Sequence, residues 1–227
     1  MFFVNFVLES IKCKSFLDFG EVLKLKIRKR IGTEQKFDAV GHSMGGLDIR
    51  ASITQGNDPL LSCSKCITVA TPHWGDNFGG IRYSASKSVI KDLINHINPL
   101  KGAQFEQGKN LDPDYPPIQL INTPENRKLF LERVEQLYQL KGTQDFVVKG
   151  SAILNRAGIE DLYMAKSKEY TVEGVNHTGD IGICQDIRTM MVIVHLLSDL
   201  PIPQDENNFG VLPGGNYKPG DNPDRIV

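Results

Sequence analysis

The chain has 227 residues, of which 40% are hydrophobic and 23% charged, a composition typical of soluble globular proteins and not of disordered or fibrous ones. Its 26 basic and 27 acidic side chains give a formal net charge of −1, so no overall charge attracts it to nucleic acid or to an anionic membrane. No apolar run approaches the roughly 18 residues that a membrane span requires, so we expect no integral membrane segment.

The cysteines and the first ten residues give no sign of a disulfide framework, a zinc site or a signal peptide. Four cysteines, Cys13, Cys63, Cys66 and Cys184, are too few and too unevenly spaced for a disulfide framework. A closed zinc site at the C-x-x-C of Cys63 and Cys66 would need two more paired ligands, so we expect no structural metal. Residues 1–10 lack the basic start and the cleavage site of a signal peptide. We therefore expect an untargeted chain, cytoplasmic by default.

Strand and helix patterns alternate along the first part of the chain. Strands are expected at residues 2–8, 37–40 and 66–70. Helices are expected at residues 18–31, ending at Gly32, and at residues 47–53. Strands separated by helices predict a parallel sheet.

The later part of the chain continues this pattern after an irregular insertion. Residues 76–117 are broken by Gly and Pro around one helical stretch at 86–97, which predicts a lid or cap over a site. Beyond it we expect a helix at 125–134, strands at 136–140 and 168–172, and a largely buried helix at 185–200. Residues 201–227 are rich in Gly, Pro and Asn and are expected to form a mobile tail. The prediction is one α/β domain at 1–200, with a lid at about 76–117.

A G-x-S-x-G motif formed by Gly41, Ser43 and Gly45 lies between a predicted strand and a predicted helix, which is the context of a nucleophile elbow. Such a turn projects the serine hydroxyl into the open, and the flanking glycines allow close backbone packing. The next residue, Met44, would offer its backbone N–H at a helix N-terminus, where it can stabilise an oxyanion. We therefore predict Ser43 as a nucleophile.

A serine nucleophile needs a histidine to take its proton and an acid to orient that histidine. His177 follows the predicted strand 168–172 and Asp145 follows the strand 136–140, so both are expected at the same edge of a parallel sheet as Ser43. Asp180 is the second choice of acid; Asp48 and Asp76 come too early in the chain. Of the other histidines, His195 is expected in the core of a helix, while His73 and His96 fit structural roles better than substrate contact.

Several segments resemble the triacylglycerol lipase and esterase branch of the α/β-hydrolase superfamily. They are GHSMGGLDIR (41–50), ITVATPHWGDNF (67–78), IQLINTPENRKLF (118–130), LKGTQDFVV (140–148) and GVNHTGD (174–180), and the resemblance covers roughly residues 1–200. It implies hydrolysis of acyl esters or lipids by Ser43, His177 and Asp145, with Met44 in the oxyanion hole and no cofactor. Substrate or lid contacts are expected at His42, His73, Trp74 and Phe78.

The resemblance leaves the substrate open, because the same branch includes deacylases of glycosylphosphatidylinositol anchors, and esterase or thioesterase activity is not separated from lipase activity. Some bacterial members hold calcium through aspartates near the histidine, for which Asp180 and Asp186 are candidates here.

The sequence departs from this family at one point. The family carries a His-Gly-type oxyanion loop after an earlier strand, and no such segment precedes Ser43. We therefore expect the first strands and the oxyanion loop to be missing, as in an N-terminally truncated product. The alternative function is a catalytically impaired or inactive remnant, or a binding module that lacks half of the oxyanion hole.

Overall fold

The computed structural model describes residues 13, 15–32, 34–56, 61–76, 111–148, 152–155, 159–179, 181–202 and 211–213. Within them the elements follow in this order: α1 (Phe16–Ile31), β1 (Phe37–His42), α2 (Met44–Thr54), β2 (Cys63–Val69), α5 (Pro116–Ile121), α6 (Pro124–Arg133), β3 (Val134–Gly142), α7 (Glu160–Lys166), β4 (Ser167–Val172), α8 (Ile187–Leu197) and β5 (Val211–Pro213).

The strands form a sheet in the order β1-β2-β3-β4-β5. The pairings β1–β2, β2–β3 and β3–β4 are parallel, and β5 joins β4 in antiparallel orientation. His42 pairs with Val69, Val69 with Leu140, and Gly142 with Val172, so the carboxyl ends of these four strands lie along one edge. The predicted parallel sheet is confirmed, and that edge is where its loops can build a site.

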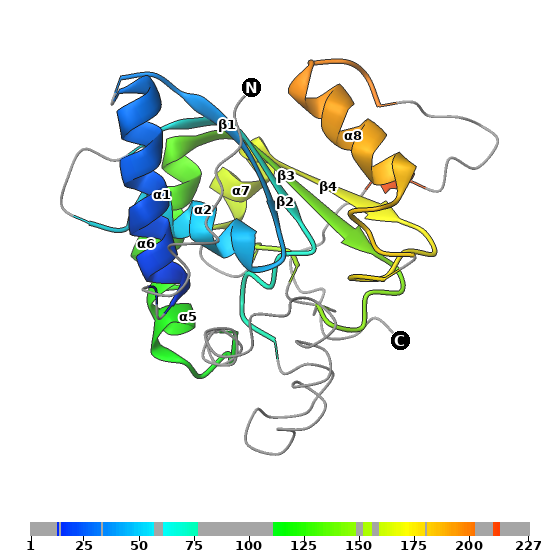
Figure 1. Cartoon of the computed structure of the whole chain (residues 1–227), viewed down its shortest axis with the longest axis horizontal. Helices are drawn as coiled ribbons and strands as arrows, with labels where there is room; N and C mark the ends of the chain where they lie inside the picture. Colours follow the sequence, from blue (N-terminus) through cyan, green and yellow to red (C-terminus); the bar gives the residue numbers. More distant parts are fainter. Residues whose placement is uncertain are drawn as a thin grey trace.

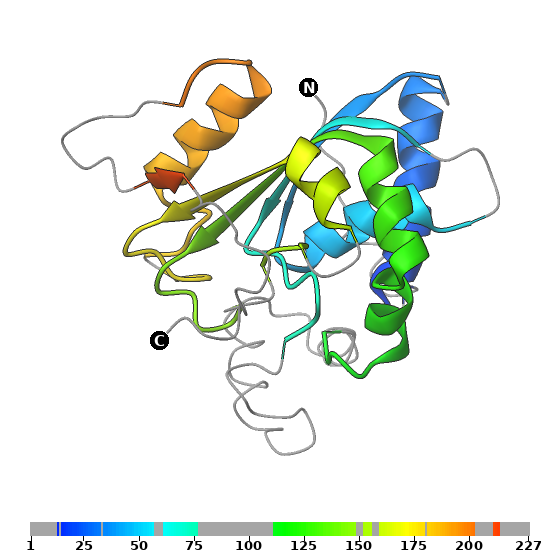
Figure 2. The ribbon, with the colours of Figure 1, turned by 180° about the vertical axis from the view of Figure 1, so that it is seen from behind.

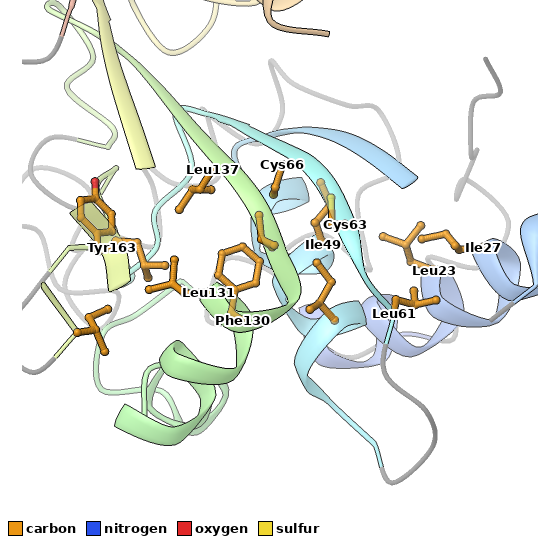
Figure 3. Close-up of a cluster of buried hydrophobic side chains, with 14 residues drawn as sticks. Leu23, Ile27, Ile49, Leu61, Cys63, Cys66, Phe130, Leu131, Leu137 and Tyr163 are labelled. Atoms are coloured by element: carbon orange, nitrogen blue, oxygen red, sulfur yellow. The ribbon is translucent and has the colours of Figure 1, made fainter. Parts of the chain in front are cut away.

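Helices cover the two faces of the sheet unequally (Figures 1 and 2). Helices α1, α2, α6 and α7 lie on one face and α8 lies on the other. Figure 3 shows the buried cluster on the first face, in which Leu23 and Ile27 of α1, Ile49 of α2 and Phe130 of α6 meet apolar side chains of β2 and β3. Val192 and Leu196 of α8 pack against Ile67, Val69 and Leu140 on the opposite face. Burial of both faces is what a parallel sheet requires.

Helix α1 shows why the sequence folds locally as it does. Ser15 caps it, because its Oγ accepts from the Asp18 N–H while the Asp18 carboxylate accepts from the Ser15 N–H at 2.9 Å. The helix ends at Gly32, whose φ of 80° suits glycine. It packs closely on α2, since a Cβ on Gly20 would lie 2.8 Å from the Ser52 backbone nitrogen. The prediction of residues 18–31 is confirmed, with the start two residues earlier.

Three elements were not expected from the sequence. Helix α5 begins with Pro116 and Pro117, which look like helix breakers but occupy the first turn, where proline is tolerated. Helix α7 is only 7 residues long and buries one side chain, Tyr163, so its periodicity is weak. Strand β5 lies inside the expected mobile tail, and that expectation does not hold for residues 211–213.

Helix α8 differs from the prediction of a largely buried helix. Only Thr189, Val192 and Leu196 are buried, whereas Ile187 is 70% exposed and Val194 is 54% exposed. Apolar composition alone predicted burial all round, but the helix contacts the sheet along one stripe. None of the helices in the described ranges is both long and apolar enough to cross a membrane. The expected strand at 2–8 and helix at 86–97 lie outside the described residues.

Candidate active site

The sharp turn between β1 and α2 carries Ser43. Its φ of 54° and ψ of −128° form a strained conformation for a residue with a side chain. The turn is held in place because the Ser43 N–H donates to the Val69 carbonyl at 2.9 Å and the Gly46 N–H donates to the Ser43 carbonyl at 3.2 Å. This strand, turn and helix are the local structure that the G-x-S-x-G pattern predicts.

Close packing explains two of the glycines around Ser43. A Cβ on Gly41 would lie 2.7 Å from both Gly46 N and Ile49 Cδ1, and one on Gly46 would lie 2.6 Å from Thr71 Cγ2. By contrast, a Cβ on Gly45 would meet nothing within 4 Å. The expectation that the motif glycines on both sides of Ser43 allow close packing is thus right for Gly41 and wrong for Gly45, because Gly46 makes the second close approach.

His177 contacts Ser43 from the loop of a strand that is not adjacent to β1. It lies in the loop after β4, and its Nε2 is 3.0 Å from Ser43 Oγ, although β1 and β4 are separated by β2 and β3. The carboxyl-edge loops of the parallel strands therefore meet above β1, as the chain order suggested. The His177 side chain is only 5% exposed, so this contact is largely shielded from water.

Asp145 completes the hydrogen-bonded chain. Its Oδ2 is 2.9 Å from His177 Nδ1, while its Oδ1 accepts from the N–H groups of Val147 at 2.9 Å and Val148 at 2.8 Å. A carboxylate can only accept, so Nδ1 donates to it and Nε2 is left to accept from the Ser43 hydroxyl. The structure thus brings Ser43, His177 and Asp145 together in the tautomeric arrangement that serine activation needs.

Met44 is the first residue of α2, so its backbone N–H has no acceptor within that helix. It lies directly after Ser43 at a helix N-terminus, where the helix dipole favours negative charge. The arrangement can therefore supply a nucleophile, a base, an orienting acid and one donor for an oxyanion.

The ring of His42 lies against the ring of His177. The two ring centroids are 5.0 Å apart with an interplanar angle of 36°. Burial, and then repulsion from His177, lower the pKa of His42 to about 4. His42 therefore contacts the predicted base, whereas the sequence predicted a substrate or lid contact for it.

His73 belongs to the packed interior, whereas the neighbouring Trp74 is half-buried. His73 is fully buried between Thr68 Oγ1, 3.1 Å from its Nε2, and the Arg50 guanidinium, 3.3 Å from its Nδ1. Burial, followed by the nearby Arg50 charge, lowers the pKa of His73 well below its usual value. Trp74 donates from Nε1 to the Ile153 carbonyl at 3.0 Å and stacks on the guanidinium of Arg127. Full burial corrects the expectation of substrate contact at His73 and fits its structural role, while substrate contact at Trp74 stays a prediction.

The other candidate residues lie away from the site or are not among the described residues. His195 is not a core residue, since it is partly exposed on α8 with Nδ1 2.7 Å from the Pro201 carbonyl. Phe78, His96 and Asp180 lie outside the described residues, as does most of the expected lid. Both carboxylate oxygens of Asp186 bind Arg188, at 2.9 and 2.7 Å, so calcium at Asp180 and Asp186 stays a prediction.

Sequence reasoning missed a buried cation beside the site. Arg50 of α2 is fully buried, and its guanidinium donates to the carbonyls of His73 and Ile121, at 3.0 and 2.9 Å, and to Asn122 Oδ1 at 3.0 Å. Burial lowers its pKa to about 9. These bonds join the loop after β2 to the end of α5, and the available signal was an arginine between the apolar residues Ile49 and Ile53.

Asp48 has an unusual environment one turn into α2. Its Oδ1 is buried without a hydrogen-bond partner, and burial raises the pKa of this carboxyl to about 8. A carboxyl of this kind is mostly protonated at neutral pH.

The fold is similar to that of two solved structures of phospholipase PlaB from Legionella pneumophila, one of them in complex with thio-NAD. The sequence identities are 14% and 16% and the TM-scores 0.53 and 0.52, over 81% and 84% of this chain. The chain spans about half the length of those structures, 48% and 47%. No protein-family model matches the sequence, and a comparison with curated proteins finds no match either. The fold is an α/β-hydrolase fold, a mostly parallel sheet flanked by helices.

Proposed function

We propose that this chain is a serine hydrolase that cleaves carboxylic esters through an acyl-enzyme. The observation that carries the proposal is the continuous hydrogen-bonded chain from Ser43 Oγ through His177 to the buried Asp145, with contacts of 3.0 and 2.9 Å. Random packing does not place a strained serine, a histidine and a buried carboxylate in this sequence of contacts.

In the proposed reaction, Ser43 Oγ attacks the ester carbonyl carbon while its proton passes to His177 Nε2. The resulting oxyanion accepts a hydrogen bond from the Met44 N–H. The C–O bond to the alcohol then breaks, and His177 returns the proton to the leaving oxygen. Water repeats the sequence on the acyl-Ser43, releasing the carboxylic acid. Asp145 holds the imidazole in place and stabilises its protonated form, and the reaction needs no cofactor.

The proposal assigns one oxyanion donor, Met44, and no second donor among the described residues. Losing one such donor costs about 10²- to 10³-fold in turnover in serine hydrolases. We therefore expect slow but measurable ester hydrolysis. The alternative, an inactive remnant, would show no ester hydrolysis.

A lipid or another hydrophobic acyl ester is the substrate class that we propose. The name of the neighbouring phospholipase supports it, as do the lipase-like segments of the sequence. Acyl-chain length, and the choice between lipase, esterase, thioesterase and anchor deacylase, then become outcomes of the assay.

The test compares the chain with Ser43→Ala and with Ser198→Ala, a matched control at an exposed serine that ends α8. Each is assayed with p-nitrophenyl butyrate and palmitate and labelled with a fluorophosphonate probe. We expect turnover and labelling in the chain and in Ser198→Ala, and neither in Ser43→Ala. A cooperatively folded chain that is neither labelled nor active would refute the proposal and favour the inactive remnant.

A further inference from the structure

The loop that carries His177 is anchored far from Ser43. At its base the Gln144 N–H donates to the Val175 carbonyl at 3.0 Å, and the Gly174 N–H donates to Thr143 Oγ1 at 2.9 Å. Both partners belong to the loop after β3, whereas Ser43 follows β1, two strands away. These anchors hold the base of the loop, and Asp145, in the same loop after β3, holds the imidazole at Nδ1. A support for the ring on the side of Ser43 has to come from β1.

His42 provides a contact on that side. It is the last residue of β1, and its ring lies 5.0 Å from the ring of His177 at a tilt of 36°. Its position is fixed by the strand, because β1 pairs with β2 through His42 itself.

We propose that His42 is a positioning residue: its ring is a rigid aromatic face on β1 against which the imidazole of His177 is held over Ser43. This inference rests on the proposed serine hydrolase function and names a residue that does not itself touch the reacting atoms. A displacement of about 1 Å at a catalytic group can cost about 100-fold in rate, so one such face can matter greatly.

The environment of His42 keeps the ring neutral where the reaction would run. Burial and the neighbouring His177 both disfavour its protonation, whereas the more distant Asp145 favours it, and the resulting pKa is about 4. A charged ring here would oppose the imidazolium that His177 must become during catalysis. The buried Nε2 of His42 has no hydrogen-bond partner, which again suits an uncharged ring.

The test separates an aromatic face at position 42 from a polar side chain without a ring. His42→Phe keeps a flat aromatic face, His42→Gln keeps a polar group without a ring, and His195→Gln on α8 is the matched control. With p-nitrophenyl butyrate we expect His42→Gln to lose about 10- to 100-fold in kcat with little change in KM, and His42→Phe to recover most of it. Equal losses in both variants, or no loss in His42→Gln, would overturn the proposal. His42→Asn replaces the Gln variant if that variant does not fold.

A second readout does not depend on ester hydrolysis. The proton on His177 Nδ1, bonded to Asp145, gives a far-downfield proton resonance that exchange with water removes when the ring is loosely held. We expect this resonance in the wild type, His42→Phe and His195→Gln, and its broadening or loss in His42→Gln. Retention in all four proteins would refute the positioning role. A sharp wild-type resonance without hydrolysis would instead refute the proposed function alone.

Discussion

Replacing Asp145 with asparagine tests the proposed chemistry with little disturbance of the fold. Asp145 Oδ1 accepts from two backbone N–H groups, of Val147 and Val148, and Oδ2 faces His177 Nδ1 at 2.9 Å. An asparagine carbonyl placed at Oδ1 keeps the two backbone bonds. Its amide NH2 then faces Nδ1, which must accept instead of donate. His177 would then carry its proton on Nε2 and could no longer take one from Ser43.

The magnitude follows from this tautomer reversal. An Asp-to-Asn change of this kind lowers kcat by about 10⁴-fold in serine hydrolases with the same arrangement. The free energy of unfolding should change by about 1 kcal/mol or less, since the buried N–H groups stay bonded. Asp145→Ala should behave differently, because it leaves two buried donors unpaired at about 1–3 kcal/mol each.

The assay combines p-nitrophenyl butyrate hydrolysis with urea unfolding. Asp161→Asn, at an exposed aspartate of α7, is the control for the chemical change itself. An Asp145→Asn protein that keeps more than about a tenth of the wild-type kcat would show that Asp145 does not set the tautomer of His177. Equal destabilisation by Asn and Ala would show that the Oδ1 bonds do not matter to the fold.

Three further changes test the packing and charge around the site, each by urea unfolding. Gly46→Ala should lower the free energy of unfolding by about 1–3 kcal/mol, because the new Cβ would meet Thr71. Gly45→Ala, whose Cβ would lie in open space, should not lower it, and equal effects of the two substitutions would contradict the packing. Burial raises the pKa of Asp48 in the folded chain to about 8, so its contribution to stability falls as pH rises from about 4 to about 8. The free energy of unfolding of Asp48→Asn, relative to wild type, should therefore rise by about 3 kcal/mol between pH 5 and pH 8. A difference that does not depend on pH would refute this. Arg50→Met should cost about 3 kcal/mol, since the Ile121 carbonyl and Asn122 Oδ1 lose the buried donor that Arg50 supplies; a neutral effect would show that the site repacks.

The parts of the fold that the sequence predicted are those with strong local signals. The helix that ends at Gly32 and the strands at 37–40 and 66–70 combine clear periodicity with turn residues at their ends. The turn at Ser43 was predictable because a strained conformation before a helix requires a particular order of small residues. Chain order and the strand ends were enough to place Asp145 and His177 at the same edge of the sheet.

Contacts between distant segments were beyond the sequence pattern. Nothing local to Arg50 states that its guanidinium bonds to the end of α5, and nothing local to His42 states that its ring meets His177. The exposure of Val194 likewise depends on which stripe of α8 the sheet covers. A short element such as α7, with little periodicity of its own, forms through its contacts and leaves only a weak trace in the sequence.

Three unfavourable features lie in one short stretch, residues 42–48. Ser43 holds a positive φ of 54°, His42 buries an unpaired ring nitrogen, and Asp48 buries an unpaired carboxyl oxygen. Each of these features costs stability, on the order of 1–3 kcal/mol, and substitutions that remove them are simple. Proteins accept such local conflicts chiefly at functional sites, where the strain and the desolvation serve the chemistry. Because the three costs lie within five residues of Ser43 in the sequence, they fit the proposed nucleophile at Ser43 better than the alternative of an inactive remnant.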